Sequence, residues 1–303
     1  MSILNEVKSG GRRKAHIIVC HGVDGVGKTT FVRGAGNAVI VGPEDDGKGK
    51  YLEAKTWEKL LAYLDALAAE QHPYTVVGID SVDWCEAMLF AAICKEDGVE
   101  NIEKYDGGYG KGYTEAQRRW RNEFLPRLSA IRARGVSVVM IAHSFIKTFT
   151  DPTINASYDR YILKLNDKAA AILREAADMV LFMNYKTVTK DEKGKKVSKA
   201  FGNGERAMYT ERRPAYDAKN RDNLPQEIEF GPTDGWVRLM AAIEAGNPGS
   251  ADALKKEIEN LLTMIPKEDE LYQTVTKHVA SIKDDVAALL VARNRLQELT
   301  QQK

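Results

Sequence analysis

Apolar runs alternate with amphipathic segments along the first half of the chain. Four runs have the length and the nearly continuous apolar character of buried strands: 16–20, 38–42, 75–79 and 136–142. Strands that are apolar at almost every position are typical of a sheet covered on both faces. Apolar residues recur at helical spacing over 54–71, and 83–96 is apolar nearly all round. The alternation predicts an α/β fold with a mostly parallel central sheet flanked by helices.

Two segments in the middle of the chain are basic. Residues 114–134 have helical spacing and carry six arginines, and Pro126 is expected to kink or divide this helix. Beyond a polar and aromatic segment, 147–166, a strand is expected at 179–185. The segment 186–213 then holds nine basic against four acidic residues around a turn at 191–195. That composition predicts a basic antiparallel β-hairpin projecting from the sheet.

The chain divides into three parts. Residues 1–14 are polar and basic and are expected to form a flexible arm before a core at 15–246. Residues 247–250, Asn-Pro-Gly-Ser, have the composition of a linker. Beyond it, apolar positions at helical spacing predict two helices, the second longer than the first. We interpret 247–303 as a C-terminal helical region that could recruit a protein partner.

Composition and charge narrow the class of protein. There are 44 basic and 43 acidic residues, so no global field favours nucleic acid and any such surface must be local. The three cysteines show no metal-ligand spacing with the five histidines, and we interpret them as reduced packing residues. No apolar run reaches about 18 residues, and the N-terminal residues lack an apolar signal segment. These features predict a cytoplasmic protein with no membrane partner.

Residues 22–30, Gly-Val-Asp-Gly-Val-Gly-Lys-Thr-Thr, carry the strongest chemical signal. They complete the G-x-x-x-x-G-K-[ST] pattern between an apolar run and the start of a helix, which is the setting that a phosphate-binding loop requires. Backbone N–H groups would turn toward phosphate oxygens, Lys28 would reach the β- and γ-phosphates, and the Thr29 hydroxyl would ligate Mg²⁺. We therefore expect ATP and Mg²⁺ as cofactors. The expected nucleotide-binding residues are Gly22, Asp24, Gly25, Val26, Gly27, Lys28, Thr29 and Thr30.

Three polar residues at strand ends extend this site. Asp80 follows the run 75–79 directly and has the position of an acid that holds the metal, although it could also cap a helix. Glu44 follows the second run, where ligands bind in open α/β sheets, and neighbouring acids could raise its pKa by repulsion. We favour Glu44 as the residue that orients the attacking water over a solvated turn or a second metal site. His143 ends the fourth run, either as a sensor of the γ-phosphate or as a histidine satisfied by the backbone.

The order of these motifs resembles the RecA-like ATPases. Lys219-Asn220-Arg221 looks like the Lys-Asn-Arg motif of the RadA branch, and with the Gly-Tyr segment 109–113 the closest match is a compact phage group of RecA/RadA-like ATPases. The resemblance covers about 15–240. It implies a RecA-like core acting in DNA recombination and single-strand annealing. It also implies a ring or filament in which ATP lies between subunits and Lys219 and Arg221 act in trans.

The resemblance further implies binding of single-stranded DNA after the strand that ends at His143. Cations that follow phosphates, interleaved with rings that stack on bases, suit such binding. The candidate residues are Lys147, Tyr158, Arg160, Tyr161 and Lys164. A solvated surface is the alternative interpretation, and the basic hairpin could extend the groove.

Two other functional classes stay open. The loop at 22–30 is close to that of thymidylate kinases, and Asp159-Arg160-Tyr161 is similar to a motif of that nucleoside monophosphate kinase family. No arginine-rich lid follows at the expected place, however. The third class is a nucleotide-gated structural or adaptor protein that works through its C-terminal helices.

Overall fold

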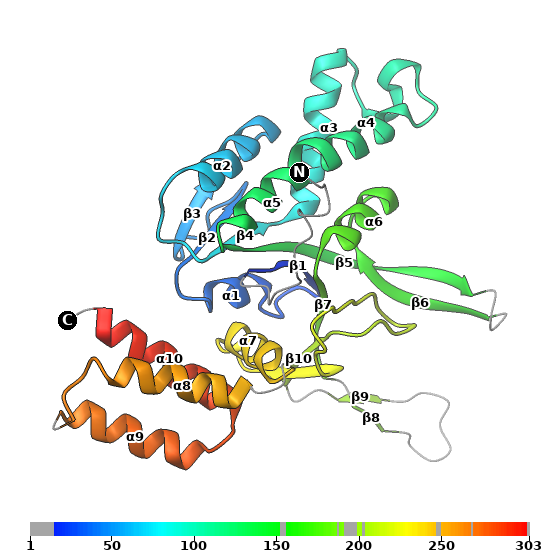
Figure 1. Ribbon diagram of the computed structural model, residues 1–303. Coiled ribbons are helices and arrows are strands. Elements are labelled where there is room, and N and C mark those ends of the chain that lie inside the picture. The colour runs from blue at the N-terminus through cyan, green and yellow to red at the C-terminus, as the bar shows by residue number, and fades with distance from the viewer. Residues whose placement is uncertain are drawn as a thin grey trace, which may run out of the picture.

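The computed structural model describes residues 15–151, 156–186, 188–190, 199–201, 204–246, 250–267 and 269–301. The arm expected at 1–14, the turn expected at 191–195 and residues 247–249 of the expected linker lie outside the described residues. Within them, the chain forms an α/β fold around one large sheet, followed by a separate group of helices (Figure 1).

In the described part of the chain, six parallel strands form the centre of the sheet, in the order β7-β1-β5-β4-β2-β3. Their bounds are β1 Ile17–Gly22, β2 Ala38–Gly42, β3 Lys50–Glu53, β4 Val76–Asp80, β5 Ser137–Asp151 and β7 Met179–Tyr185. The register places Ile18 opposite Val139 on one side and Met179 on the other. The four apolar runs and the segment 179–185 are therefore parallel strands, as their pattern predicts, and β3 is an additional edge strand.

Helices cover both faces of the sheet, which follows from the alternation of side chains along its strands. Ile17 and Val19 belong to one core cluster, and Ile18 and Cys20 to the other. The first cluster is covered by α2 Trp57–Ala69, α3 Val82–Asp97, α4 Lys111–Arg119, α5 Leu125–Ala133 and α6 Asp167–Ala176. The second lies under α1 Lys28–Arg33 and α7 Gly235–Ala245 (Figure 1). The expected two-sided covering is confirmed.

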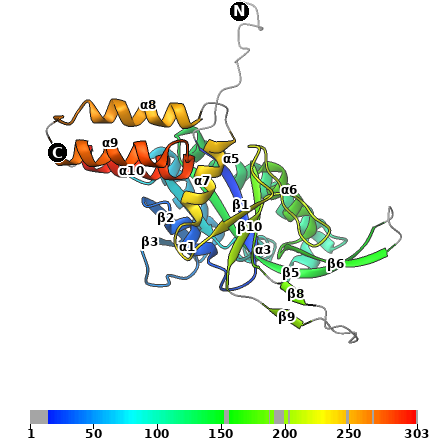
Figure 2. The ribbon, with the colours of Figure 1, turned by 90° about the horizontal axis from the view of Figure 1, so that it is seen from below.

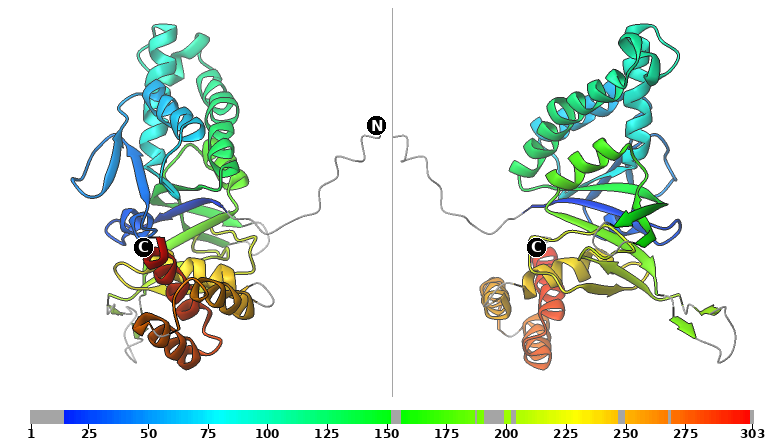
Figure 3. Two further views of the ribbon diagram at one scale, coloured as in Figure 1. Left: turned by 60° about the vertical axis from the view of Figure 1, so that its left-hand side comes forward. Right: turned by 90° about the vertical axis from the view of Figure 1, so that its right-hand side faces the viewer.

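The strand β5 continues well beyond the sheet. It pairs antiparallel with β6, Ala156–Leu163, from Ser144 opposite Leu163 to Asp151 opposite Ala156. The pair projects from the core as a long hairpin (Figures 1 and 2) and points toward the viewer in the right-hand view of Figure 3. The hydrophobic pattern predicts a strand only up to residue 142, because this projecting hairpin has no continuous apolar face to bury.

A second, smaller hairpin follows β7. β8, Val188–Lys190, pairs antiparallel with β9, Lys199–Phe201, so the hairpin expected within 186–213 is confirmed for these residues. The chain then returns to the sheet as β10, Arg206–Tyr209, which pairs antiparallel with both β7 and β11, Glu227–Phe230. This antiparallel edge was not expected from the sequence.

The basic stretch 114–134 forms α4, a π-helical stretch over Trp120–Phe124, and α5. Pro126 follows the π-helical stretch by two residues in this continuous helical run, and it removes the N–H that would bond to the carbonyl group four residues earlier. The interruption therefore precedes the proline. It turns Trp120 and Phe124 inward, where both are fully buried against Trp57 of α2.

Three helices, not two, form the described C-terminal region: α8 Ser250–Leu262, α9 Glu270–Ile282 and α10 Val286–Gln301 (Figure 2). The expectation of one long second helix was wrong because the chain turns at Lys283, whose φ of 50° is left-handed. Leu254, Ile258 and Leu289 share a core cluster with Ala241 of α7, so the C-terminal region packs against α7. No helix among the described residues is long and apolar enough to span a membrane.

Candidate nucleotide-binding site

The loop between β1 and α1 has a backbone that depends on its glycines. A Cβ on Gly22 would lie 2.0 Å from the carbonyl oxygen of Met183 in the neighbouring strand β7, so no side chain fits there. Gly25 and Gly27 have φ values of 74° and 103°, a left-handed conformation that glycine adopts most readily. Val26 between them is fully buried and anchors the loop in the core below. The loop therefore has a conformation that requires glycine at these three positions.

Lys28 is folded back over this loop. Its side chain is buried, and its ammonium donates hydrogen bonds to the carbonyl oxygens of Gly22 at 3.0 Å and Val23 at 2.9 Å. These contacts hold a positive charge at the mouth of the loop.

Thr29 and Asp80 meet, although 51 positions separate them in the chain. The Thr29 hydroxyl donates a hydrogen bond of 2.6 Å to a carboxylate oxygen of Asp80 at the end of β4. Gly78 makes this approach possible, because a Cβ there would lie 2.7 Å from a methyl group of Val32 in α1. A hydroxyl and one carboxylate fit Mg²⁺, which takes one or two carboxylates, substrate phosphates and water as ligands. The described residues contain no cluster of three or more His, Cys, Asp or Glu suited to a metal.

A cavity of about 240 Å³ joins the residues that follow the parallel strands. It is lined by Thr29, Arg33, Ile40, Pro43, Glu44, Asp45, Asp46, Tyr51, Asp80, Ser81, Trp84 and His143. The structure thus brings together four of the expected site residues, Thr29, Glu44, Asp80 and His143. Their common origin is the carboxyl edge of a parallel sheet, where strand ends converge.

The two acidic residues that follow Glu44 have hydrogen-bond partners of their own. Glu44 is exposed at the rim of the cavity, while Asp46 is bound by the guanidinium of Arg33 at 2.7 Å. This bond holds the pKa of Asp46 below its usual range. Asp45 accepts a hydrogen bond from the backbone of Gly47 at 2.8 Å. The guanidinium of Arg33 on α1 therefore partly neutralises the negative charge of Asp46 beside Glu44.

His143 is oriented by a carboxylate that the sequence did not single out. Asp83 in the first turn of α3 accepts hydrogen bonds from the backbone N–H of His143 at 3.1 Å and pairs with its Nδ1 at 2.9 Å. An acceptor on Nδ1 sets the tautomer with the proton there. The ring is 37% exposed and lines the cavity. The Asp83 carboxylate thus binds both the backbone and the ring of His143, and Nε2 is the ring nitrogen that Asp83 leaves free.

The buried ring of His21 in β1 connects β5 to the segment around Asp217 through two hydrogen bonds. It is fully buried, with Nδ1 2.9 Å from the hydroxyl of Ser144 and Nε2 2.9 Å from the carbonyl oxygen of Asp217. Burial lowers the pKa of His21 to about 4. The neutral ring connects the residue after His143 to the segment that leads to Lys219.

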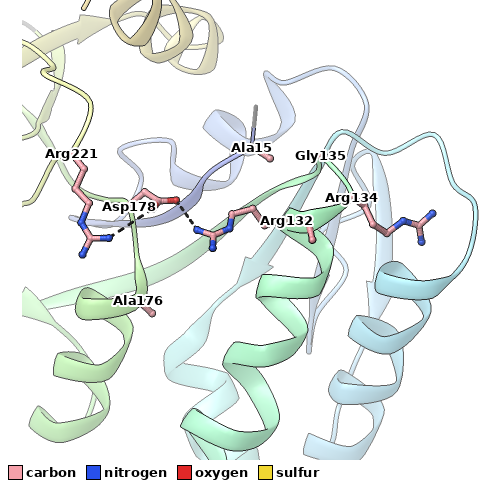
Figure 4. A pocket seen from close by; sticks show the side chains of 8 residues that line it. Ala15, Arg132, Arg134, Gly135, Ala176, Asp178 and Arg221 are labelled. Atoms are coloured by element: carbon pink, nitrogen blue, oxygen red, sulfur yellow. Dashed lines mark hydrogen bonds and ion pairs between the residues drawn. The ribbon is translucent and has the colours of Figure 1, made fainter. Parts of the chain in front are cut away.

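Lys219 and Arg221 lie away from the phosphate-binding loop of their own chain. Lys219 pairs through its backbone with Val180 near the start of β7, hence toward the amino edge of the sheet, opposite the loop. Its ammonium donates to the last carbonyl oxygens of α6, those of Arg174 and Ala177, both at 2.7 Å. Arg221 lies 4.0 Å from Asp178, next to a cavity of about 690 Å³ (Figure 4). The structure does not bring this pair to the loop in cis.

The residues expected to bind DNA have different environments. Arg160 is buried, donates to the carbonyl oxygen of Pro214 at 2.8 Å and lies 3.6 Å from Asp217. The ring of Tyr161 packs on Phe182 at 5.1 Å. The Arg160 side chain therefore holds the segment around 214–217 against β6, and the backbone N–H of Tyr161 adds a hydrogen bond of 2.8 Å to the carbonyl oxygen of Ala215. The remaining candidates are more open: Lys147 pairs with Asp167 at 2.7 Å, Tyr158 is half-buried, and Lys164 is exposed.

A comparison with family models finds a match, described as an AAA domain, over residues 14–222. No curated protein matches the chain. The matched segment includes the phosphate-binding loop, Asp80, His143 and Lys219, and it spans more than half of the 303 residues. It does not single out the phage RecA/RadA-like group, so that finer assignment stays a prediction. The chain belongs to the AAA-domain family of P-loop NTPases.

Proposed function

We propose that this protein is a Mg²⁺-dependent ATPase that uses the site between β1, β4 and β2. The observation that carries the proposal is the 2.6 Å contact between Thr29 and Asp80 beside a formed phosphate-binding loop. A threonine hydroxyl and a strand-end aspartate in contact are the pair that holds the metal ion in P-loop proteins. The metal would neutralise charge on the β- and γ-phosphates.

The side chains around the cavity have separable roles in this proposal. Lys28 exchanges the carbonyl oxygens of Gly22 and Val23 for phosphate oxygens, which are stronger partners because they are charged. Glu44 at the cavity rim orients the attacking water. His143, fixed by Asp83, presents its ring to the same space and contacts the terminal phosphate or the water.

Phosphate release tests this proposal. Lys28→Ala and Asp80→Asn are expected to abolish hydrolysis, whereas Glu44→Gln should keep nucleotide binding and lose most turnover. Glu70→Gln, at an exposed carboxylate after the end of α2 and outside the cavity, is the control and should keep near wild-type turnover. Equal rates for wild type and Glu44→Gln would remove Glu44 from the mechanism, and equal rates for wild type and Lys28→Ala would refute the ATPase proposal.

We infer further that the ATPase works as an assembly, in which Lys219 and Arg221 serve a neighbouring subunit. Support comes from their position: both lie toward the amino edge of the sheet, and the loop of the same chain lies at the carboxyl edge. Only a second copy could bring these edges together. Mixing Lys28→Ala with Arg221→Ala tests this. A Lys28→Ala subunit still offers Arg221 to its neighbour, and an Arg221→Ala subunit still has an intact phosphate-binding loop. Restored hydrolysis in the mixture is expected, and two inactive variants that stay inactive together would contradict the proposal.

Single-stranded DNA is the partner we propose for this assembly in the cytoplasm. A groove of about 610 Å³ beside the β5–β6 hairpin is lined by five cationic and three acidic side chains. On the hairpin itself, Phe149 lies under the guanidinium of Arg160 at 5.1 Å, so rings and cations alternate there. This composition suits a sequence-tolerant single strand. Binding of a labelled oligonucleotide should weaken as salt rises and fall in Lys147→Ala, with Lys104→Ala, which lies on a different surface, as control.

The kinase alternative is less well supported. A nucleoside monophosphate kinase needs a free arginine for its second substrate, and Arg160 of the Asp159-Arg160-Tyr161 motif is buried and bonded to Pro214 and Asp217. Transfer of phosphate to dTMP without DNA-linked hydrolysis would reverse this preference. The adaptor alternative predicts that the full chain functions with Glu44→Ala and fails with Lys28→Ala.

A further inference from the structure

Two residues from outside the usual loop motif lie against the phosphate-binding loop. β7 ends at Tyr185 and β10 begins at Arg206, and the antiparallel register places these two residues directly opposite each other. Opposed residues of neighbouring strands point to the same face of a sheet and contact each other. Because β7 is parallel to β1, the end of β7 lies at the same edge as the loop.

The contacts with the loop are specific. The hydroxyl of Tyr185 donates a hydrogen bond of 2.8 Å to the carbonyl oxygen of Gly25. The guanidinium of Arg206 lies over the Tyr185 ring, 5.7 Å from its centroid. Its Nη1 is so close to Gly27 that a Cβ added there would lie 3.1 Å from it. Tyr185 thus fixes both the loop and the arginine.

Arg206 differs in its charge environment from most arginines of the core. Arg33, Arg119 and Arg174 each pair with at least one carboxylate. No acidic side chain in the described ranges lies within ion-pair distance of Arg206, which is only half-buried. A guanidinium offers five N–H donors and no acceptor. The cation beside Gly27 therefore has donors to spare for an anion bound in the loop.

The sheet order shows which part of a nucleotide these donors would reach. Thr29 and Asp80 lie toward β5 and β4, on one flank of β1, whereas Tyr185 and Arg206 lie on β7 and β10, on the other flank. In the proposed site, Thr29 and Asp80 would hold the metal beside the terminal phosphate on the first flank. The phosphates nearer the nucleoside would then lie toward the second flank.

We propose that Arg206 binds a non-terminal phosphate of the nucleotide held by its own chain, and that Tyr185 is a positioning residue for it. This inference rests on the proposed nucleotide site and adds a cis-acting arginine to it. Neither residue belongs to the loop motif, Asp80 or the Lys-Asn-Arg segment.

The test compares ATP and ADP binding to the full chain in the presence of Mg²⁺, by titration calorimetry. Arg206→Gln is expected to weaken both nucleotides equally, by about 10- to 100-fold, which is the loss of a hydrogen bond to a charged group. Arg206→Lys should recover part of the affinity because it keeps the charge. Arg238→Gln on α7, an exposed arginine paired with Asp234, is the matched control and should bind as wild type does.

A double-mutant cycle tests the role of Tyr185. Tyr185→Phe keeps the ring under Arg206 and removes only the bond to Gly25, so it controls for the loop contact. Tyr185→Leu also removes the ring and should weaken ADP binding more than Tyr185→Phe does, whereas in the Arg206→Gln background the two Tyr185 variants should bind ADP equally. Additive losses would refute the positioning role. Unchanged ADP affinity in Arg206→Gln, or a loss confined to ATP, would overturn the proposal for Arg206. A wild-type protein that binds neither nucleotide would instead refute the proposed nucleotide site.

Discussion

Lowering the pH from 7 toward 4 is expected to destabilise the folded chain through His21. Protonation is the perturbation, and it acts at a fully buried ring whose two nitrogens already have partners, the Ser144 hydroxyl and the Asp217 carbonyl oxygen. Burial is the main reason that the pKa of this ring falls to about 4 from an ordinary value of 6.5. Nearby Lys28 and Arg174 lower the pKa further, and Asp217 opposes them.

The size and sign of the effect follow from these two pKa values. Below pH 6.5 the unfolded chain takes up a proton at His21, while the folded chain stays neutral down to about pH 4. The unfolded state therefore binds more protons in this window, and the free energy of unfolding falls by about 1.4 kcal/mol per pH unit. Over the whole window the loss is about 3 kcal/mol, a large part of a typical domain stability.

Urea unfolding at several pH values between 7.5 and 4.5 measures this effect. His21→Phe should be less stable than wild type at pH 7.5, because Ser144 and Asp217 lose their partner. The difference between the two proteins should then narrow by about 1.4 kcal/mol per unit as the pH falls below 6.5. His21→Asn, neutral and able to hydrogen-bond, should show the same narrowing, and His278→Gln, at an exposed position on α9, is the control. Parallel curves for wild type and both His21 variants would refute the reasoning.

Three further predictions concern other buried contacts. Burial raises the pKa of Glu86 to about 7. The free energy of unfolding should therefore fall by about 3 kcal/mol as the pH rises from 4.5 through 7. Melting curves of Glu86→Gln should not show this fall. Phe124→Ala should destabilise by about 3–5 kcal/mol in urea, because its ring is fully buried against Trp120; an effect below 1 kcal/mol would contradict the packing. Lys219→Met leaves the carbonyl oxygens at the end of α6 without their donor and should destabilise by about 1–3 kcal/mol by the same assay, with Lys168→Met at the start of α6 as control.

The sequence predicts the nucleotide edge of this fold well, and the reason is physical. Buried parallel strands must be apolar along their whole length, so β1, β2, β4 and the buried part of β5 stand out as apolar runs. Residues directly after such strands converge at one edge. The meeting of Thr29, Glu44, Asp80 and His143 in one cavity could therefore be inferred without a structure.

Other features depend on contacts that leave no local pattern. Arg206 begins a four-residue antiparallel strand, and only its pairing with β7 brings it to the loop. Asp83 lies within a helix expected to be buried, and its role becomes visible only when β5 places His143 beside it. The turn at Lys283 interrupts an apolar periodicity that continues on both sides. A signal for Tyr185 did exist, since it ends an apolar strand as Asp80 does.

Because the His21 ring is neutral, the donor and the acceptor in each of its two hydrogen bonds can be assigned. A carbonyl oxygen can only accept, so Nε2 carries the proton that is donated to Asp217, and Nδ1 must accept from the Ser144 hydroxyl. A protonated ring would have two donors, and Ser144 would have to turn its hydroxyl hydrogen away. Ser144 follows His143, whose ring lines the cavity beside Thr29 and Asp80. Protonation of His21 would therefore alter the hydrogen bonding of a residue directly beside the candidate catalytic cavity.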